Sequence, residues 1–292
     1  MTAAPPTGVG FIGLGQIGAP MATRLLAWPD GLTVCDVVPE PTAPFADAGA
    51  HVAATPAAVA ARAGVISLMV RDDAQVTEVL LGSDGIVEAA APGTVVAIHS
   101  TVEAATPARL RDEALRHHVE IVDAPVSGGF MGAHEGTLAI MVGGSDTAMA
   151  AVREPFALMG TLVAHLGDVG AGTRAKLARN LITFASFAAV GEAARLAEAA
   201  GVDLGALGDV VRHSDAVTGG PGAVMLRGQT GPIPDDDGLR AIFAHTRELG
   251  EKDLRLALDL GAETGTDLPI ARQALERLAE ALGVPHANQE QP

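Results

Sequence analysis

The chain has 292 residues, of which 48% are hydrophobic, and a formal net charge of −16 at pH 7. That length exceeds what one hydrophobic core usually serves, so it predicts about two domains. The negative charge argues against nucleic-acid binding, because phosphates require a basic surface. The single cysteine, Cys35, excludes an intramolecular disulfide and favours a reducing cytoplasm. Its apolar surroundings predict a buried, unreactive thiol.

The sequence also predicts a protein that does not enter a membrane. The start of the chain, Met1 to Thr7, lacks the basic and apolar regions of a secretory signal. The alanine-rich stretch 181–200 is interrupted by Glu192, Arg195 and Glu198, which is too many charges for a membrane span. We therefore expect a cytoplasmic globular protein.

Apolar runs of strand length alternate with helical patterns in the first half of the chain. The expected strands cover residues 8–12, 32–36, 64–70, 94–98 and 119–123, and the expected helices cover 17–28, 56–62, 73–81 and 103–117. This alternation is typical of βαβ units in a mostly parallel sheet. Two further strands, at 137–142 and 161–166 around a helix at 146–159, are expected to extend the same sheet.

The strand patterns end at about Asp168. A long helix to about Ala200 is expected, followed by helices at 203–213, 238–263 and 268–282. The segment 218–238 is expected to be a long loop, and the residues from Pro285 a loose polar tail. The predicted fold class is α/β, with a mostly parallel sheet domain at 1–166 and an all-helical domain at 167–292.

A glycine-rich fingerprint follows the first expected strand and opens a helix. Its spacing is GxGxxG: Gly13 permits a tight turn, Gly15 lets the backbone approach a pyrophosphate, and Gly18 lets the helix pack on the strand. The amides of the helix N-terminus would then bind the diphosphate. The predicted cofactor-binding loop consists of Gly13, Leu14, Gly15, Gln16, Ile17 and Gly18.

Asp36 ends the second expected strand, eighteen residues after Gly18. A carboxylate at this offset binds the ribose hydroxyls of a dinucleotide. It would repel a 2′-phosphate, and neither Val37 nor Val38 supplies a positive charge. The predicted cofactor is therefore NAD rather than NADP. A glycine turn with a solvated aspartate is the weaker alternative, because strand, helix and acid occur together.

Two groups of residues could bind a substrate. Ser127, Gly128 and Gly129 follow an expected strand and could form a small nest for a carboxylate, although a glycine-rich turn is the alternative. Lys176 and Asn180 are spaced i, i+4, so they share one helix face. The chain has only two lysines, Lys176 and Lys252, against seventeen arginines.

Lysine differs from arginine in that a desolvated ammonium can release its proton near neutral pH. The occurrence of lysine at only two positions favours a role in proton transfer, whereas a solvated surface lysine is the ordinary alternative. Histidines are scattered, and the adjacent His117 and His118 lack the i, i+4 spacing of a chelating pair, so no metal site is expected.

Five segments in this order resemble the β-hydroxyacid dehydrogenase family, which includes 3-hydroxyisobutyrate dehydrogenase and tartronate semialdehyde reductase. The resemblance covers about residues 8–283. The segments that carry it are GLGQIGAPMA at 13–22, Ser100-Thr101, DAPVSGG at 123–129, GxGxxxKxxxN at 170–180 and Lys252-Asp253.

The resemblance implies a Rossmann-type domain, a helical domain and a site in the cleft between them. It implies that Lys176 is the catalytic acid/base. The substrate carboxylate would be bound by Ser127, Gly128 and Gly129, with Asn180 and Asp253 beside the substrate. The cofactor would contact Thr101, Lys252 and the backbone around Val70 and Arg71.

The chain departs from the family pattern at four places. Val70-Arg71 replaces Leu-Pro, His99 stands where a small or acidic residue is common, Arg179 replaces an asparagine, and the usual polar–aromatic tail is missing. These departures bear on the substrate rather than on the reaction.

The expected reaction is hydride transfer between NAD and the hydroxyl carbon of a short β-hydroxy acid, or its semialdehyde in reverse. An imine reductase is an alternative, which Lys176 disfavours, and a non-catalytic dinucleotide-binding module is a second. The expected partners are a small carboxylate substrate and further copies of the chain in a homodimer or homotetramer.

Overall fold

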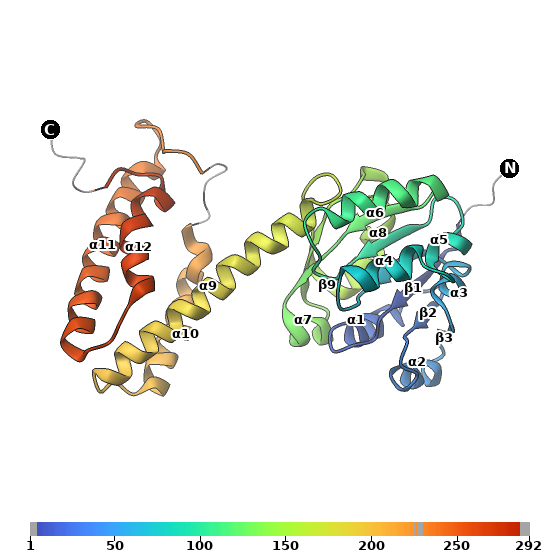
Figure 1. Cartoon of the computed structure of the whole chain (residues 1–292), viewed down its shortest axis with the longest axis horizontal. Coiled ribbons are helices and arrows are strands. Elements are labelled where there is room, and N and C mark those ends of the chain that lie inside the picture. The colour runs from blue at the N-terminus through green and yellow to red at the C-terminus, as the bar shows by residue number, and fades with distance from the viewer. Residues whose placement is uncertain (1–4, 225, 227–229, 287–292) are drawn as a thin grey trace. The chain divides into compact units, whose positions relative to one another are not determined.

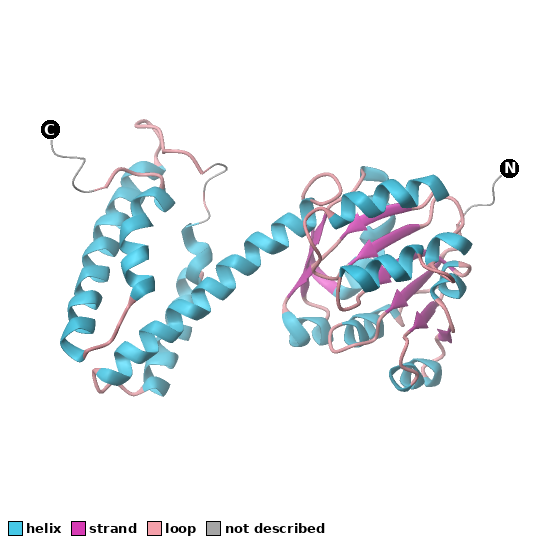
Figure 2. Cartoon of the chain, in the orientation of Figure 1, coloured by secondary structure: helices cyan, strands magenta, loops and turns pink. Residues whose placement is uncertain are grey.

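The computed structural model describes residues 5–224, 226 and 230–286 (Figure 1). The chain divides into two compact units, Met1–Arg179 and Asn180–Pro292. Among the described residues, strands occur in the first unit alone and the second unit is helical (Figure 2). The predicted fold class, an α/β domain followed by an all-α domain, is thereby confirmed.

Six parallel strands form the main sheet of the first unit in the order β3-β2-β1-β4-β5-β6. The chain builds outward from β1 in one direction and then, from β4, in the other. Ligands of open α/β sheets bind at the carboxyl ends of the strands where this reversal occurs. The strands are β1 (Gly8–Ile12), β2 (Leu32–Cys35), β3 (His51–Val52), β4 (Ala63–Leu68), β5 (Val95–Ile98) and β6 (Glu120–Asp123).

Helices pack on both faces of this sheet, because successive strand residues point to opposite faces. Val9 and Phe11 of β1 belong to one core, and Ile12 belongs to the other. The first core includes residues of α1 (Gly18–Leu25) and α8 (Asp146–Met159). The second includes residues of α3 (Pro56–Ala60), α4 (Asp73–Leu81), α5 (Ile86–Ala89) and α6 (Thr106–Ala114).

Side chains of the conventional capping types begin several of these helices. Thr55 accepts a hydrogen bond from the Ala58 amide at the start of α3, and Asp72 accepts one from the Gln75 amide at the start of α4. Ser145 accepts one from the Ala148 amide at the start of α8. Each cap satisfies an amide that has no partner within its own helix.

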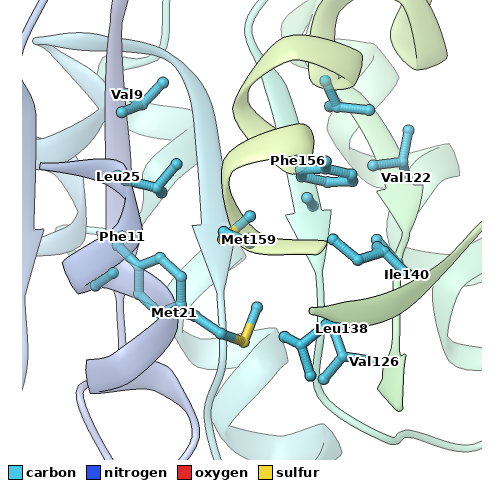
Figure 3. Close-up of a cluster of buried hydrophobic side chains, with 14 of the residues drawn as sticks. Val9, Phe11, Met21, Leu25, Val122, Val126, Leu138, Ile140, Phe156 and Met159 are labelled. Carbon is cyan, nitrogen blue, oxygen red and sulfur yellow. The ribbon is translucent and has the colours of Figure 1, made fainter. Parts of the chain in front are cut away.

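The expectation that strands at 137–142 and 161–166 extend the main sheet is wrong. Both belong to a separate three-stranded sheet, β7-β8-β9, made of Val126–Ser127, Leu138–Val142 and Gly160–His165. β7 is antiparallel to β8, and β8 is parallel to β9. An isolated bridge between Asp123 and Gly143 connects the two sheets. Val126, Leu138 and Ile140 pack with residues of β1, α1 and α8 in the first core (Figure 3).

Short elements were not expected from the sequence. They are η1 (Glu40–Thr42), α2 (Ala43–Asp47), β3, α5, η2 (Leu115–His117), β7, α7 (Gly129–Glu135) and η3 (Gly220–Val224). The helix expected at 103–117 begins at Thr106, and its last turn is the 3₁₀ helix η2. Cys35 is buried, as predicted. Burial raises the pKa of its thiol, with the Asp36 carboxylate as a second cause.

The described part of the second unit consists of most of α9 (Ala171–Ala199), α10 (Leu204–Thr218), α11 (Leu239–Thr264) and α12 (Pro269–Leu282). A small core contains Ile233, Phe243, Leu282 and Val284. The buried Glu192 carboxylate of α9 accepts hydrogen bonds from the Ile270 and Ala271 amides, at 3.0 and 2.9 Å. These amides lie in the first turn of α12, so a residue of one helix caps another.

The predicted loop at 218–238 lies partly outside the described residues, which omit 225 and 227–229, as does the tail beyond 286. Within the described ranges, none of the helices is both long enough and apolar enough to cross a membrane.

His99 lies buried at the end of β5, between the first core and the end of β6. Its Nδ1 is 2.7 Å from the Ala124 carbonyl oxygen and its Nε2 is 3.0 Å from Ser67 Oγ. Burial lowers the pKa of His99 to about 4, although the Ala124 carbonyl acts in the opposite sense. The native protein therefore holds His99 neutral at pH values where the unfolded chain protonates it.

We expect this burial to make the protein less stable in mild acid. The unfolded chain binds a proton as the pH falls below about 6.5, so the contribution of His99 should be lost progressively from there down to about pH 4, up to about 3 kcal/mol in total. Urea unfolding of wild type and His99→Gln at several pH values measures it. The free energy of unfolding of His99→Gln should fall less steeply over this pH range than that of wild type. His117→Gln, at an exposed site, should follow wild type. Parallel curves for wild type and His99→Gln would contradict this account.

Candidate functional site

The glycine-rich loop joins β1 to α1 through a tight turn. Gly13 has a φ of +95°, and its amide donates to the Cys35 carbonyl at 3.0 Å. A Cβ on Gly18 would overlap the carbonyl oxygen of Gly13, so helix and loop touch there. Gly15 has no protein atom within 4 Å of the place where a Cβ would stand. The loop is therefore tight where it meets the protein and open at Gly15, where a ligand would approach.

Asp36 lies directly beside this loop. Its Oδ2 accepts a hydrogen bond from the Leu14 amide at 2.5 Å, and its Oδ1 accepts one from the Val38 amide at 2.8 Å. The carboxylate thus links the end of β2 to the glycine loop. A carboxylate can accept about four hydrogen bonds, so it retains capacity for ribose hydroxyls.

Ser100 forms hydrogen bonds that connect the loop after β4 with the loop after β5. The Val70 amide donates to Ser100 Oγ at 2.9 Å, and the hydroxyl donates back to the Val70 carbonyl at 2.7 Å. Ser100 is buried, whereas its neighbour Thr101 is exposed. Arg71, also exposed, follows Val70 in the same loop. These loops occupy the carboxyl ends of adjacent parallel strands, at the same edge of the sheet as the glycine loop.

Ser127 ends β7, and the two following glycines make the turn into α7. Gly128 has a φ of +136° and Gly129 a φ of +63°, both in the region that disfavours other residues. A Cβ on Gly129 would meet no atom within 4 Å, so the backbone there is uncovered. Exposed amides beside a serine hydroxyl can bind a carboxylate.

Lys176 lies on α9 and reaches the segment that contains Ser127. Its Nζ donates a hydrogen bond to the Val126 carbonyl at 2.7 Å, and the side chain is partly buried. Burial lowers the pKa of Lys176, and the nearby Arg179 guanidinium lowers it further. The structure thus brings Lys176 next to the predicted carboxylate-binding segment, through a contact with Val126 across 50 positions of the sequence. An ammonium with a lowered pKa, held beside an uncovered backbone, can transfer a proton to or from a bound substrate.

The sequence indicates Asp123 as part of a motif but does not predict its contacts. The carboxylate is fully buried and accepts hydrogen bonds from the amides of Gly170, just before α9, and Thr173, in its first turn. A carboxylate directly after an apolar strand is the sequence signal that could have indicated this role, since such a buried charge requires partners.

The remaining predicted residues belong to the second unit. Asn180 lies on α9, one turn beyond Lys176. Lys252 and Asp253 lie on α11 and form an ion pair, with Nζ and Oδ1 3.1 Å apart and both side chains exposed.

Two protein-family models cover nearly the whole chain. Residues 8–167 match the NAD binding domain of 6-phosphogluconate dehydrogenase. Residues 170–291 match the NAD-binding domain of NADP-dependent 3-hydroxyisobutyrate dehydrogenase. The first half is therefore an NAD-binding domain of the Rossmann type, and the glycine loop described above lies within it.

Two curated relatives are similar to this chain over most of its length. An uncharacterized oxidoreductase of Mycobacterium tuberculosis is 54% identical over 99% of this chain and 98% of its own length. The mitochondrial 3-hydroxyisobutyrate dehydrogenase of Homo sapiens is 34% identical over 91% of this chain and 79% of its own length.

Three solved structures are also similar to this chain. A crystal structure from Mycobacterium avium 104 is 51% identical, has a TM-score of 0.91, and covers 95% of this chain and 99% of that one. A Mycobacterium tuberculosis 3-hydroxyisobutyrate dehydrogenase with L-serine is 29% identical, with a TM-score of 0.66 and 96% of both chains covered. An imine reductase from Myxococcus stipitatus shares the fold, with a TM-score of 0.73 at 20% identity, covering 96% of this chain and 94% of that one.

Proposed function

The chain belongs to the β-hydroxyacid dehydrogenase family, and on that premise we propose that it oxidises a short β-hydroxy acid with NAD, using Lys176 as the general acid/base. Membership makes the chain an NAD-binding oxidoreductase. The observation that supports this particular reaction is the contact between Lys176 and the Val126 carbonyl, because it holds an ammonium beside Ser127.

The proposed chemistry divides between cofactor and protein. When bound, NAD supplies the hydride acceptor, to which the hydrogen on the hydroxyl carbon is transferred. Lys176, as the neutral amine, removes the hydroxyl proton in this direction. In the reverse direction its ammonium donates a proton to the oxygen of the semialdehyde. Ser127, Gly128 and Gly129 bind the substrate carboxylate, and Asn180 and Asp253 orient the substrate.

We further propose that NAD is preferred over NADP. Gly13 to Gly18, Thr101, Lys252 and the backbone at Val70 and Arg71 would contact the cofactor. The carboxylate of Asp36, held beside the loop by the Leu14 amide, favours free ribose hydroxyls over a 2′-phosphate. The match to a domain named for an NADP-dependent enzyme covers residues 170–291, which do not include Asp36. The local charge at Asp36 therefore carries more weight for cofactor choice than that name.

The test is nicotinamide absorbance with NAD and with NADP across short β-hydroxy acids, among them 3-hydroxyisobutyrate, L-serine and glycerate. We expect turnover with at least one acid and a kcat/KM at least about tenfold higher with NAD, which corresponds to about 1.4 kcal/mol. Cofactor binding without turnover of any acid would reject the proposed substrate class and favour an imine reductase or a binding module.

We also propose that the chain is a homodimer or homotetramer, because the middle of α9 exposes large apolar side chains. Leu181, Phe184, Phe187 and Val190 are each more than half exposed. Large apolar side chains that are exposed together on one stretch of helix are typical of an interface. Sedimentation velocity should show a dimer or larger species for wild type and a smaller species for the double variant Phe184→Glu, Phe187→Glu. A monomeric wild type at micromolar concentration would reject the proposal.

A further inference from the structure

The carboxylate of Asp123 ties the end of β6 to the beginning of α9. Its Oδ1 accepts a hydrogen bond from the Gly170 amide at 2.6 Å, and its Oδ2 accepts one from the Thr173 amide at 2.5 Å. Amides at the start of a helix have no acceptor within the helix, so both oxygens satisfy groups that would otherwise lack partners. Because the side chain is fully buried, water cannot replace these bonds without a change in structure.

The segment that begins at Asp123 makes a second contact with α9. Three residues beyond Asp123, the Val126 carbonyl accepts the hydrogen bond from Lys176 Nζ, and Lys176 itself lies three residues beyond Thr173. The helix is also close to this segment, since a Cβ on Gly172 would come within 2.8 Å of the Asp123 carbonyl oxygen. A lysine side chain is long and flexible, so its nitrogen does not stay in one place by itself. It stays beside Val126 only where the helix that carries it is held in position.

We propose that Asp123 is a positioning residue for Lys176: it fixes the first turn of α9 and thereby holds the lysine nitrogen against Val126, beside Ser127. The consequence for turnover rests on the proposed function of Lys176. The position of Lys176, in contrast, is a property of the free protein and can be measured without a substrate.

Two possible effects of Asp123 on Lys176 have opposite signs. If Asp123 fixes the helix, its loss lets water reach Lys176, and the pKa of the lysine rises because burial is the main cause of its lowering. If Asp123 acted only as a nearby negative charge, its loss would disfavour the ammonium and lower that pKa further. The direction of change therefore separates positioning from a simple charge effect.

The experiment is the pH dependence of amine acylation by acetic anhydride, read by peptide mass spectrometry for wild type and Asp123→Asn. The chain suits it because Lys176 and Lys252 are its only lysines. Asparagine offers one acceptor oxygen in place of two, so the amide of Gly170 or that of Thr173 loses its bond. We expect the titration midpoint of Lys176 to move upward and that of the exposed Lys252 to stay unchanged. A midpoint of Lys176 that falls or stays would overturn the proposal.

A matched control removes a cap from another helix of the same unit. Ser145→Ala deprives the Ala148 amide at the start of α8 of its acceptor. It should lower the thermal unfolding midpoint without moving the midpoint of Lys176. An equal shift in Ser145→Ala would mean that any loss of stability produces the effect, and the proposal would fail.

A second variant serves if Asp123→Asn does not fold. Thr173→Pro keeps the carboxylate and its charge but removes one of its two donors, within the first turn, where proline is best tolerated in a helix. It should also raise the Lys176 midpoint, and an unchanged midpoint in this variant would overturn the proposal.

Kinetics provide the functional readout once a substrate is known. We expect Asp123→Asn to lower kcat about 10²-fold, as a displacement of about 1 Å can do, with the KM for NAD nearly unchanged. An unchanged kcat would overturn the role in turnover. If wild type oxidises no β-hydroxy acid, the proposed function fails, and the acylation result still decides whether Asp123 positions Lys176.

Discussion

Replacing Lys176 by methionine should lower kcat by about 10²- to 10⁴-fold, the range typical of a lost general acid/base. The NAD dissociation constant should change little, because the lysine contacts Val126 rather than the glycine loop. Lys176→Arg should lower kcat as severely, since guanidinium does not release its proton at any workable pH. Steady-state kinetics and cofactor fluorescence titration measure the two quantities separately.

Arg174→Met is the matched control, because it removes a positive charge from the same end of α9 at an exposed position. Surface substitutions usually change free energies by no more than about 0.5 kcal/mol, so kcat should stay within about a factor of two. Full activity in Lys176→Met would reject the proposed mechanism. The pH profile adds a second check: oxidation requires the neutral amine, so its rate should rise with pH through the lowered pKa of Lys176.

Replacing Gly15 by alanine should weaken NAD binding without harming the fold. No protein atom lies within 4 Å of the new methyl group, so the only clash expected is with a bound cofactor. Overpacking of this kind costs about 1–3 kcal/mol, which corresponds to about a five- to hundredfold increase in Kd. Fluorescence titration measures Kd, and thermal unfolding without NAD should give a midpoint close to that of wild type.

Gly191→Ala provides the comparison for Gly15→Ala. Its methyl group would meet only Arg195 Nη1, at an ordinary 3.9 Å, and the residue lies on α9 away from the glycine loop. We expect unchanged NAD affinity in this variant. If Gly15→Ala binds NAD as tightly as Gly191→Ala does, the pyrophosphate does not approach the backbone at Gly15.

Local patterns were sufficient to predict the elements around the proposed cofactor site. The strand and helix around Gly13 to Gly18 and the carboxylate at Asp36 occupy the expected places, because turn geometry and apolar periodicity are encoded within a few residues. The assignment of 137–142 and 161–166 to the main sheet was wrong for the opposite reason. A strand pattern does not specify its partner, and the two-residue strand β7 that starts the second sheet is too short to give a pattern.

Contacts between distant residues were beyond prediction from one sequence. The motif at 123–129 and Lys176 each have a local sequence signal, but their contact depends on how the first turns of α9 pack within the first unit. The Asp123 carboxylate contributes to this packing through hydrogen bonds from amides 47 and 50 positions away. Likewise, the sequence indicates Glu192 only as a charge that interrupts an apolar stretch, whereas its side chain caps α12 from 78 positions away.

The contacts of Asp123 join segments that are far apart in the sequence. Between Asp123 and Gly170 lie β7, α7, β8, α8 and β9, so the hydrogen bond between these two residues closes a long loop, and we expect it to form after the local elements. Contacts that close long loops form late and slowly. Local opening at such a place also requires less free energy than global unfolding. We expect the Gly170 and Thr173 amides to exchange with solvent deuterium sooner than those of β5, so that a warmed or mildly denatured protein loses activity while its main sheet is still intact and recovers it on cooling.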